Sequence, residues 1–371
     1  MSTAPDPRGP SPREDGIRIG RLEPGPHNAI TDVTDIRVGH ATIWADDAEP
    51  PVGTGVARTG VTVIVPGDPA TLVDRPVPAG AAVLNGAGEL TGFLEISEWG
   101  RIGTPIYLTG TMQVGRVFDG AVVAALAAVP SVGVTDVVIP VVGECDDSWL
   151  NDARTLHVTA DDVQRALGAA VAGPVVQGAV GAGTGMLTLG WKGGIGSASR
   201  VCPTVGATLG VLVLSNFGSA RDLCIDGVPI GETLEGGGTE PPEPAGSCIA
   251  VVATDAPLRP LQLQRIARRC GLGLGRMGSF AYHGSGEIFV AISTGGRVDR
   301  RSPANREHLE VVPDSFLDEL FLATVEATEE AVLNAMWAAP DVVGRDGRLA
   351  RGLPHDEVLE LLRGAGRVAA R

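Results

Sequence analysis

The chain has 371 residues, of which 44% are hydrophobic and 20% are charged, and its formal net charge is −15. This composition is typical of a globular protein and excludes an intrinsically disordered one. Because the negative charge repels phosphate backbones, we expect no nucleic-acid partner.

The first 16 residues contain four prolines and no apolar core, which predicts a flexible tail, not a signal peptide, before a single domain over residues 17–371. The most apolar stretch, residues 120–143, is broken by Pro130, Asp136 and Pro140. That pattern indicates a buried helix, a turn and a strand, so we expect no membrane partner.

The five cysteines form no C-x-x-C pair, which favours reduced thiols in a cytoplasmic protein. The six histidines do not cluster with them, so no zinc or other metal site is expected. Lys192 is the single lysine and lies in a glycine-rich turn.

Apolar periodicity predicts the regular elements along the chain. Strands are expected at residues 28–43, 61–65, 137–142, 208–214, 249–253 and 288–292. Helices are expected at residues 119–129, 160–171, 261–270, 314–336 and 354–362, with a glycine-rich turn and a helix-like pattern at 84–96. Strands and helices do not alternate strictly, so a layered α/β sandwich is favoured over a doubly wound sheet.

Residues 231–246 have no apolar period and indicate an exposed loop. The loop ends at Gly246, and Ser247 leads directly into an apolar strand. A serine hydroxyl needs a neighbouring base to act as a nucleophile. If the Gly246–Ser247 bond were cut, Ser247 would gain an α-amine of pKa about 7.7–8.0, of which about a sixth is unprotonated at pH 7. The alternative is an ordinary turn before a strand.

Two further segments could support such a serine. Ser285 and Glu287 are two residues apart, so they share one face if the strand has begun there. A carboxylate beside a hydroxyl could hold an N-terminal ammonium; the alternative is a surface turn with a solvated acid. Asn216 ends another strand, and its amide could donate to an oxyanion or simply cap the strand.

Taken together, these segments resemble the DmpA-type aminopeptidases, the family of L-aminopeptidase/D-esterase and β-peptidyl aminopeptidases. The resemblance runs in family order through almost the whole chain. It is carried by NAITDVTDIRVGHAT, GTPIYLTGTMQVG, PVVGECDDSWLND, GAVGAGTGM, VLSNFG, AGSCIAVVATDAPL and HGSGEIFVAIST.

The resemblance implies a self-cleaving hydrolase with an αββα-type sandwich like that of DmpA and ornithine acetyltransferase. It implies a cut between Gly246 and Ser247 that leaves residues 1–246 and 247–371 associated, in homo-oligomers. By this resemblance Ser247 is nucleophile and base, and Ser285, Glu287 and Asn216 assist it. Glu144 would hold the free amine of a small peptide, amide or ester substrate, and no cofactor is needed.

Two positions depart from the family pattern. A tyrosine usually follows that glutamate by two positions, where this chain has Asp146, and Gly110 stands where the family usually has asparagine. An ionised aspartate cannot donate a hydrogen bond. We therefore expect Asp146 to affect substrate binding differently from a tyrosine.

Other functions are weighed against this one. The G-x-G-x-x-G at residues 273–278 follows a helix and not a strand, unlike a dinucleotide site. The chain contains no G-x-S-x-G elbow, so a serine triad hydrolase is disfavoured. A thiol nucleophile is also disfavoured, because the side chain of Cys248 should lie on the strand face opposite to Ser247. Two alternatives remain. One is a self-cleaving acyltransferase of the ornithine acetyltransferase type, whose pattern has threonine where this chain has serine; the other is a non-catalytic binding protein on the same scaffold.

Overall fold

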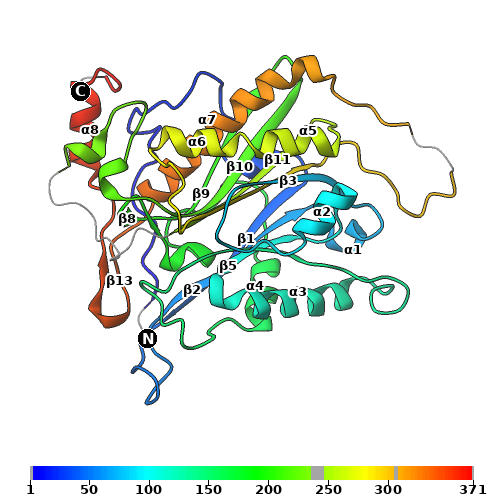
Figure 1. The fold of residues 1–371 in the computed structure, drawn as a ribbon, viewed down its shortest axis with the longest axis horizontal. Coiled ribbons are helices and arrows are strands. Elements are labelled where there is room, and N and C mark those ends of the chain that lie inside the picture. Colours follow the sequence, from blue (N-terminus) through cyan, green and yellow to red (C-terminus); the bar gives the residue numbers. More distant parts are fainter. Residues whose placement is uncertain (1–2, 235–245, 305–307, 370–371) are drawn as a thin grey trace.

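The computed structural model describes residues 3–234, 246–304 and 308–369, which form four layers, helices–sheet–sheet–helices (Figure 1). One sheet has four strands in the order β1-β2-β5-β6, and the other has six in the order β4-β3-β12-β11-β10-β9. The four strands are β1 (Ile36–Ala45), β2 (Ala57–Pro66), β5 (Ile106–Gly110) and β6 (Val141–Cys145). The six are β3 (Val77–Gly86), β4 (Arg101–Ile102), β9 (Gly194–Cys202), β10 (Ala207–Asn216), β11 (Ser247–Thr254) and β12 (Gly286–Ser293).

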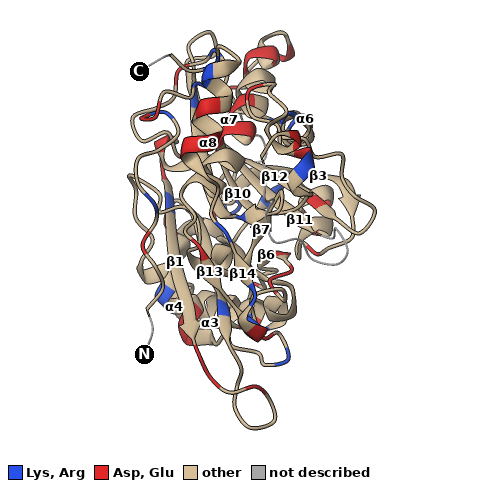
Figure 2. Ribbon diagram, turned by 90° about the vertical axis from the view of Figure 1, so that its left-hand side faces the viewer, with Lys and Arg blue, Asp and Glu red and all other residues tan. Residues whose placement is uncertain are grey.

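Helices cover the outer face of each sheet (Figure 1). The helices are α1 (Pro69–Leu72), α2 (Phe93–Trp99), α3 (Val114–Ala128), α4 (Ala160–Gly168), α5 (Pro260–Ala267), α6 (Cys270–Arg276), α7 (Leu317–Trp337) and α8 (His355–Gly364). Two small hairpins pair β7 (Leu187–Thr188) with β8 (Trp191–Lys192) and β13 (Val342–Val343) with β14 (Leu349–Ala350). Acidic residues gather on α7 and α8 (Figure 2). None of the helices within the described ranges is long and apolar enough to cross a membrane.

The core follows the alternation of side chains along the strands. On β11, Ile249 and Val251 point between the sheets, whereas Cys248 and Ala250 point toward α5–α7. A third cluster packs α3 and α4 on the four-stranded sheet and includes Tyr107. The predicted layered sandwich is thus confirmed in its architecture.

Several boundaries differ from the predictions. The strand predicted from Asn28 begins only at Ile36, because a 3₁₀ turn at Ile30–Asp32 and a left-handed Asp35 precede it. The helix predicted at 261–270 ends at Ala267, and the strand predicted from Val137 begins at Val141. Strands β3, β5 and β9 were not predicted. Strands β3 and β9 are rich in glycine, alanine or serine and show no apolar alternation, whereas β5 is short and buried on both faces, so its side chains do not alternate either.

Residues 3–16, from the segment predicted to be a flexible tail, lie against α7. The Arg8 amide donates to the carbonyl of Ala338 at 2.9 Å, and Arg13 forms an ion pair with Glu330 at 2.5 Å. The Trp337 indole donates to Asp15 at 3.2 Å. These partners are over 300 residues away in the chain, so local sequence patterns do not indicate them.

Candidate active site

Ser247 is the first residue of β11, an inner strand of the six-stranded sheet, and so lies where that strand begins. It pairs with Asn216 of the antiparallel strand β10 and with Gly286 of the parallel strand β12. Ser247 is 5% exposed. Residues 235–245 of the predicted loop lie outside the described residues. The pairing of β11 with β10 and β12 brings Ser247, Asn216 and the Ser285–Glu287 segment together at one end of these strands.

Glycine at position 246 allows the backbone before the serine to pass close to the end of β10. A Cβ on Gly246 would lie 2.2 Å from the carbonyl oxygen of Asn216 and 2.7 Å from Cα of Phe217, closer than real Cβ atoms approach backbone. The carbonyl of Gly246 accepts a hydrogen bond from the amide of Gly286 at 2.9 Å. A backbone donor thus already polarises the carbonyl that adjoins Ser247.

Ser285 and Glu287 interact as their spacing predicted. The Ser285 hydroxyl donates to Oε1 of Glu287, whose side chain is fully buried. Burial raises the pKa of Glu287, although the bond from Ser285 opposes the shift. Oε2 of Glu287 is buried and has no hydrogen-bond partner among the described residues. A buried carboxylate oxygen without a partner is costly, so this position would favour an added cation or donor.

The Asn216 amide is held in one orientation by two backbone groups. Nδ2 donates to the carbonyl of Asp146 at 2.9 Å, and Oδ1 accepts from the amide of Leu187 at 2.8 Å. One of the two Nδ2 hydrogens is therefore engaged, and a second is available for an oxyanion.

Glu144 lies on β6, the edge strand of the other sheet. Its Oε1 accepts from the amide of Glu89 at 2.8 Å, and the Thr111 hydroxyl donates to Oε2. The side chain is 2% exposed, and burial raises its pKa against these two hydrogen bonds. A Cβ at Gly88 would lie 2.9 Å from Oε1 of Glu144 and 3.7 Å from Cα of Gly286, so this loop bridges Glu144 and the Ser247 segment.

Asp146 contributes its main chain to this region. Besides accepting from Asn216, it uses its carboxylate to bind the amide and hydroxyl of Ser148, both at 2.9 Å. The residue is exposed. The neighbouring Asp147 is buried, and burial raises its pKa to about 7. A Cβ at Gly110 would lie 2.3 Å from Oδ2 of Asp147, so the carboxyl of Asp147 fills the space beside that glycine.

Thr111, Gly88 and Asp147 were not identified from the sequence. Thr111 reaches Glu144 because β5 and β6 run in parallel, with Thr109 opposite Glu144. A polar residue directly after a buried strand is a weak signal that could have pointed to Thr111. In the described ranges no group of three His, Cys, Asp or Glu side chains could hold a metal ion.

Comparison with known proteins decides the family. Residues 28–350 match the family described as peptidase family S58. The chain belongs to peptidase family S58. It is 39% identical to the β-peptidyl aminopeptidase BapA of Sphingosinicella microcystinivorans, over all of this chain and 96% of that one. The resemblance to the DmpA-type aminopeptidases that the sequence indicated is thereby confirmed.

Solved structures agree with the family. The L-aminopeptidase D-Ala-esterase/amidase of Ochrobactrum anthropi, described as a variant of the Ntn hydrolase fold, matches with a TM-score of 0.91 and 38% identity over 97% of this chain and all of that one. A Burkholderia β-aminopeptidase matches with a TM-score of 0.87 and 40% identity, covering 97% and 99% of the two chains. This S58 protein is therefore a hydrolase of the aminopeptidase/amidase type, as the sequence predicted.

Proposed function

We propose that this S58 hydrolase cuts itself between Gly246 and Ser247 and then uses Ser247 to remove N-terminal residues from small peptides, amides or esters. The observation that carries the proposal is the position of Ser247. The carbonyl of Gly246, directly before it, accepts a hydrogen bond from the Gly286 amide. Ser247 pairs with Gly286 of β12, which lies between Ser285 and Glu287. We further propose a cytoplasmic homo-oligomer of cleaved units, residues 1–246 with 247–371.

In self-cleavage, Oγ of Ser247 attacks the carbonyl carbon of Gly246. The C–N bond then breaks, giving an ester on Oγ and a free amine on Ser247. Water hydrolyses the ester, which leaves a carboxylate on Gly246 and restores the hydroxyl. The amide of Gly286 stabilises negative charge on the carbonyl oxygen during attack.

In turnover, the new α-amine takes the proton from Oγ while Oγ attacks the substrate carbonyl. The amine then gives that proton to the leaving group, and water releases the acyl group by the same route. The free oxygen of Glu287 provides negative charge for the α-ammonium, Ser285 orients Glu287, and Asn216 offers its second amide hydrogen to the oxyanion. Glu144 and Asp146 would make the site favourable for the substrate's ammonium.

Intact-mass analysis with N-terminal sequencing tests self-cleavage directly. We expect the purified wild type to give two fragments, the smaller beginning Ser-Cys-Ile-Ala, and Ser247→Ala to stay as one chain. Cys248→Ala is the matched control, because it removes the neighbouring nucleophile on the opposite strand face, and it should still be cut. A wild type that stays whole for days would refute the proposal and favour a binding protein.

Glu144→Gln is expected to raise KM for amino-acid amides by about 10- to 100-fold with a smaller change in kcat, since a hydrogen bond to a charged group is worth about 1.5–3 kcal/mol. Because burial raises the pKa of Glu144, this carboxylate should become protonated at a higher pH than an ordinary glutamate. KM should therefore rise on acidification. Initial rates against pH check both effects. Glu89→Gln is the control, since only the backbone amide of Glu89 binds Glu144. If KM of Glu144→Gln still rose on acidification, another group would be responsible for the pH dependence.

Asp146→Tyr is expected to increase kcat/KM on amino-acid amides by about tenfold, because a phenol can donate to developing charge and one such bond is worth about 1–1.5 kcal/mol. Steady-state kinetics on amino-acid p-nitroanilides measure the change. Asp146→Asn, which keeps a side-chain oxygen for Ser148, separates the loss of charge from the gain of the phenol. Unchanged kinetics in Asp146→Tyr would show that the side chain at position 146 contributes neither to substrate binding nor to catalysis.

A further inference from the structure

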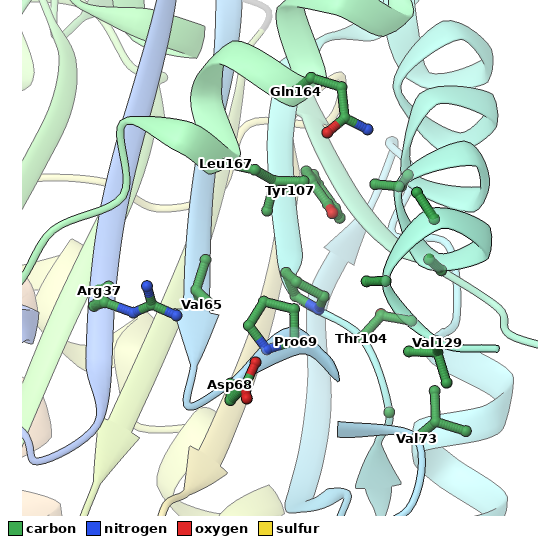
Figure 3. Close-up of a pocket in the computed structure, with 17 residues that line it drawn as sticks. Arg37, Val65, Asp68, Pro69, Val73, Thr104, Tyr107, Val129, Gln164 and Leu167 are labelled. Carbon is green, nitrogen blue, oxygen red and sulfur yellow. The ribbon is translucent and has the colours of Figure 1, made fainter. Parts of the chain in front are cut away.

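A cavity of about 450 Å³ lies on the outer face of the four-stranded sheet, between α1, α3 and α4 (Figure 3). Its walls are mostly aliphatic side chains from α3, β2 and the segments beside α1. This volume is within the range of small-molecule sites, which are apolar with a few placed polar groups. The cavity is separate from the Ser247 region, because the residues of β5 alternate: Tyr107 faces α3, and Leu108 faces the space between the sheets.

The first polar group is the hydroxyl of Tyr107. The side chain is 1% exposed and lines the cavity, and Figure 3 shows its hydroxyl directed at the space between the sheet and α3. The hydroxyl of Thr104, which also lines the cavity, is buried and has no hydrogen-bond partner among the described residues. Burial raises the pKa of Tyr107, so the group stays protonated and can donate.

The second polar group is the guanidinium of Arg37 on β1. One of its nitrogens donates to the carbonyl of Gly67 at 2.9 Å, and it forms no ion pair with any described residue. Asp68 also lines the cavity, but its carboxylate accepts from the amide of Ala70 at 3.0 Å and so caps α1. Arg37 and Asp68 thus bring opposite charges to the cavity, and the N–H donors of Arg37 that the Gly67 carbonyl does not use remain available to a ligand.

We propose that this cavity is a binding site for a small carboxylate with an apolar body, such as a medium-chain aliphatic acid. The carboxylate pairs with Arg37, the apolar body covers the alanines of α3, and the hydroxyl of Tyr107 donates to an oxygen of the ligand. A carboxylate suits the site because guanidinium groups bind it through two parallel hydrogen bonds. The site lies outside the residues proposed for hydrolysis.

Isothermal titration calorimetry of the purified protein with octanoate tests the proposal. We expect saturable one-to-one binding of octanoate, and binding at least tenfold weaker for octan-1-ol and octylamine, which lack the negative charge. Arg37→Gln should weaken octanoate by about tenfold or more, and Ala125→Leu, which fills the cavity, should abolish the heat signal. Val123→Leu is the control on the exposed side of α3 and should bind as the wild type does.

Hydrolysis of amino-acid p-nitroanilides separates this proposal from the catalytic one. All three variants should keep wild-type turnover without octanoate, because none belongs to the proposed catalytic residues. Equal affinity for octanoate and octan-1-ol, or unchanged binding by Ala125→Leu, would overturn the carboxylate site. So would the absence of saturable octanoate binding by the wild-type protein.

Discussion

Replacing Gly246 with alanine is expected to slow self-cleavage by about a hundredfold or more while the chain still folds. The added Cβ would lie 2.2 Å from the carbonyl oxygen of Asn216, so the backbone at the cut must shift. A displacement of about 1 Å at reacting atoms can cost a hundredfold in rate. The shift would also weaken the 2.9 Å hydrogen bond from the Gly286 amide, which stabilises the carbonyl under attack.

The rate is measured by following the loss of the intact chain by mass spectrometry after purification under denaturing conditions and refolding. Gly275→Ala is the matched control, because a Cβ there meets nothing within 4 Å and the residue lies in α6. Circular dichroism of the uncut Gly246→Ala chain shows whether it folds. Cleavage at the wild-type rate in a folded Gly246→Ala would mean that the backbone at this bond does not limit the reaction.

The parts of the candidate site that lie close in sequence could be predicted from it. The glycine, the serine and the apolar strand at 246–253 are contiguous, and the hydrogen bond between Ser285 and Glu287 follows from their spacing of two. Their catalytic roles stay predictions. The register that aligns Ser247 with Asn216 and Gly286 depends on how strands far apart in the chain pair, and no local pattern specifies that pairing.

The contacts of Glu144 could not be predicted for the same reason. They come from Thr111 after β5 and from the loop after β3, and β3 itself was missed because its alanines and glycines show no apolar alternation. Asn216 shows a second limit. Its position at a strand end was predicted, but the bond from Nδ2 to the Asp146 carbonyl requires the loop after β6 to return over β10. Polar side chains satisfy distant backbone groups, which only the packed structure reveals.

Lys192, the single lysine, has the surroundings of a structural ammonium. The side chain is fully buried, and Nζ donates to the carbonyls of Gly183, Met186 and Gly193 at 3.0, 2.8 and 2.7 Å. These three acceptors use all three N–H bonds of the ammonium. They fix the segment that carries Leu187, whose amide orients Asn216.

Lys192→Met is expected to lower the free energy of unfolding by about 3 kcal/mol, since a buried acceptor left without a donor costs about 1–3 kcal/mol. The full cost of three is not expected, because the carbonyls of Gly183 and Met186 also accept from backbone amides. Loosening the Leu187 segment should also lower kcat more than it raises KM, because Asn216 would act on the oxyanion and not on the bound substrate. Denaturant unfolding of the uncut Ser247→Ala background and kinetics of the processed enzyme measure the two effects.

Met186→Leu is the matched control, since it changes a buried side chain of the same segment at nearly constant volume. The pH dependence gives an independent check. Burial lowers the pKa of Lys192 to about 7 from the 10.5 of the unfolded chain, so the folded state binds fewer protons between these values. The stability of the wild type relative to Lys192→Met should therefore rise as the pH rises from about 7 to 10.5, and should stay constant below about 7. A stability difference that does not vary with pH would show that Lys192 titrates in the folded chain as it does in the unfolded one. Its three carbonyl acceptors would then fully offset the cost of burying the ammonium.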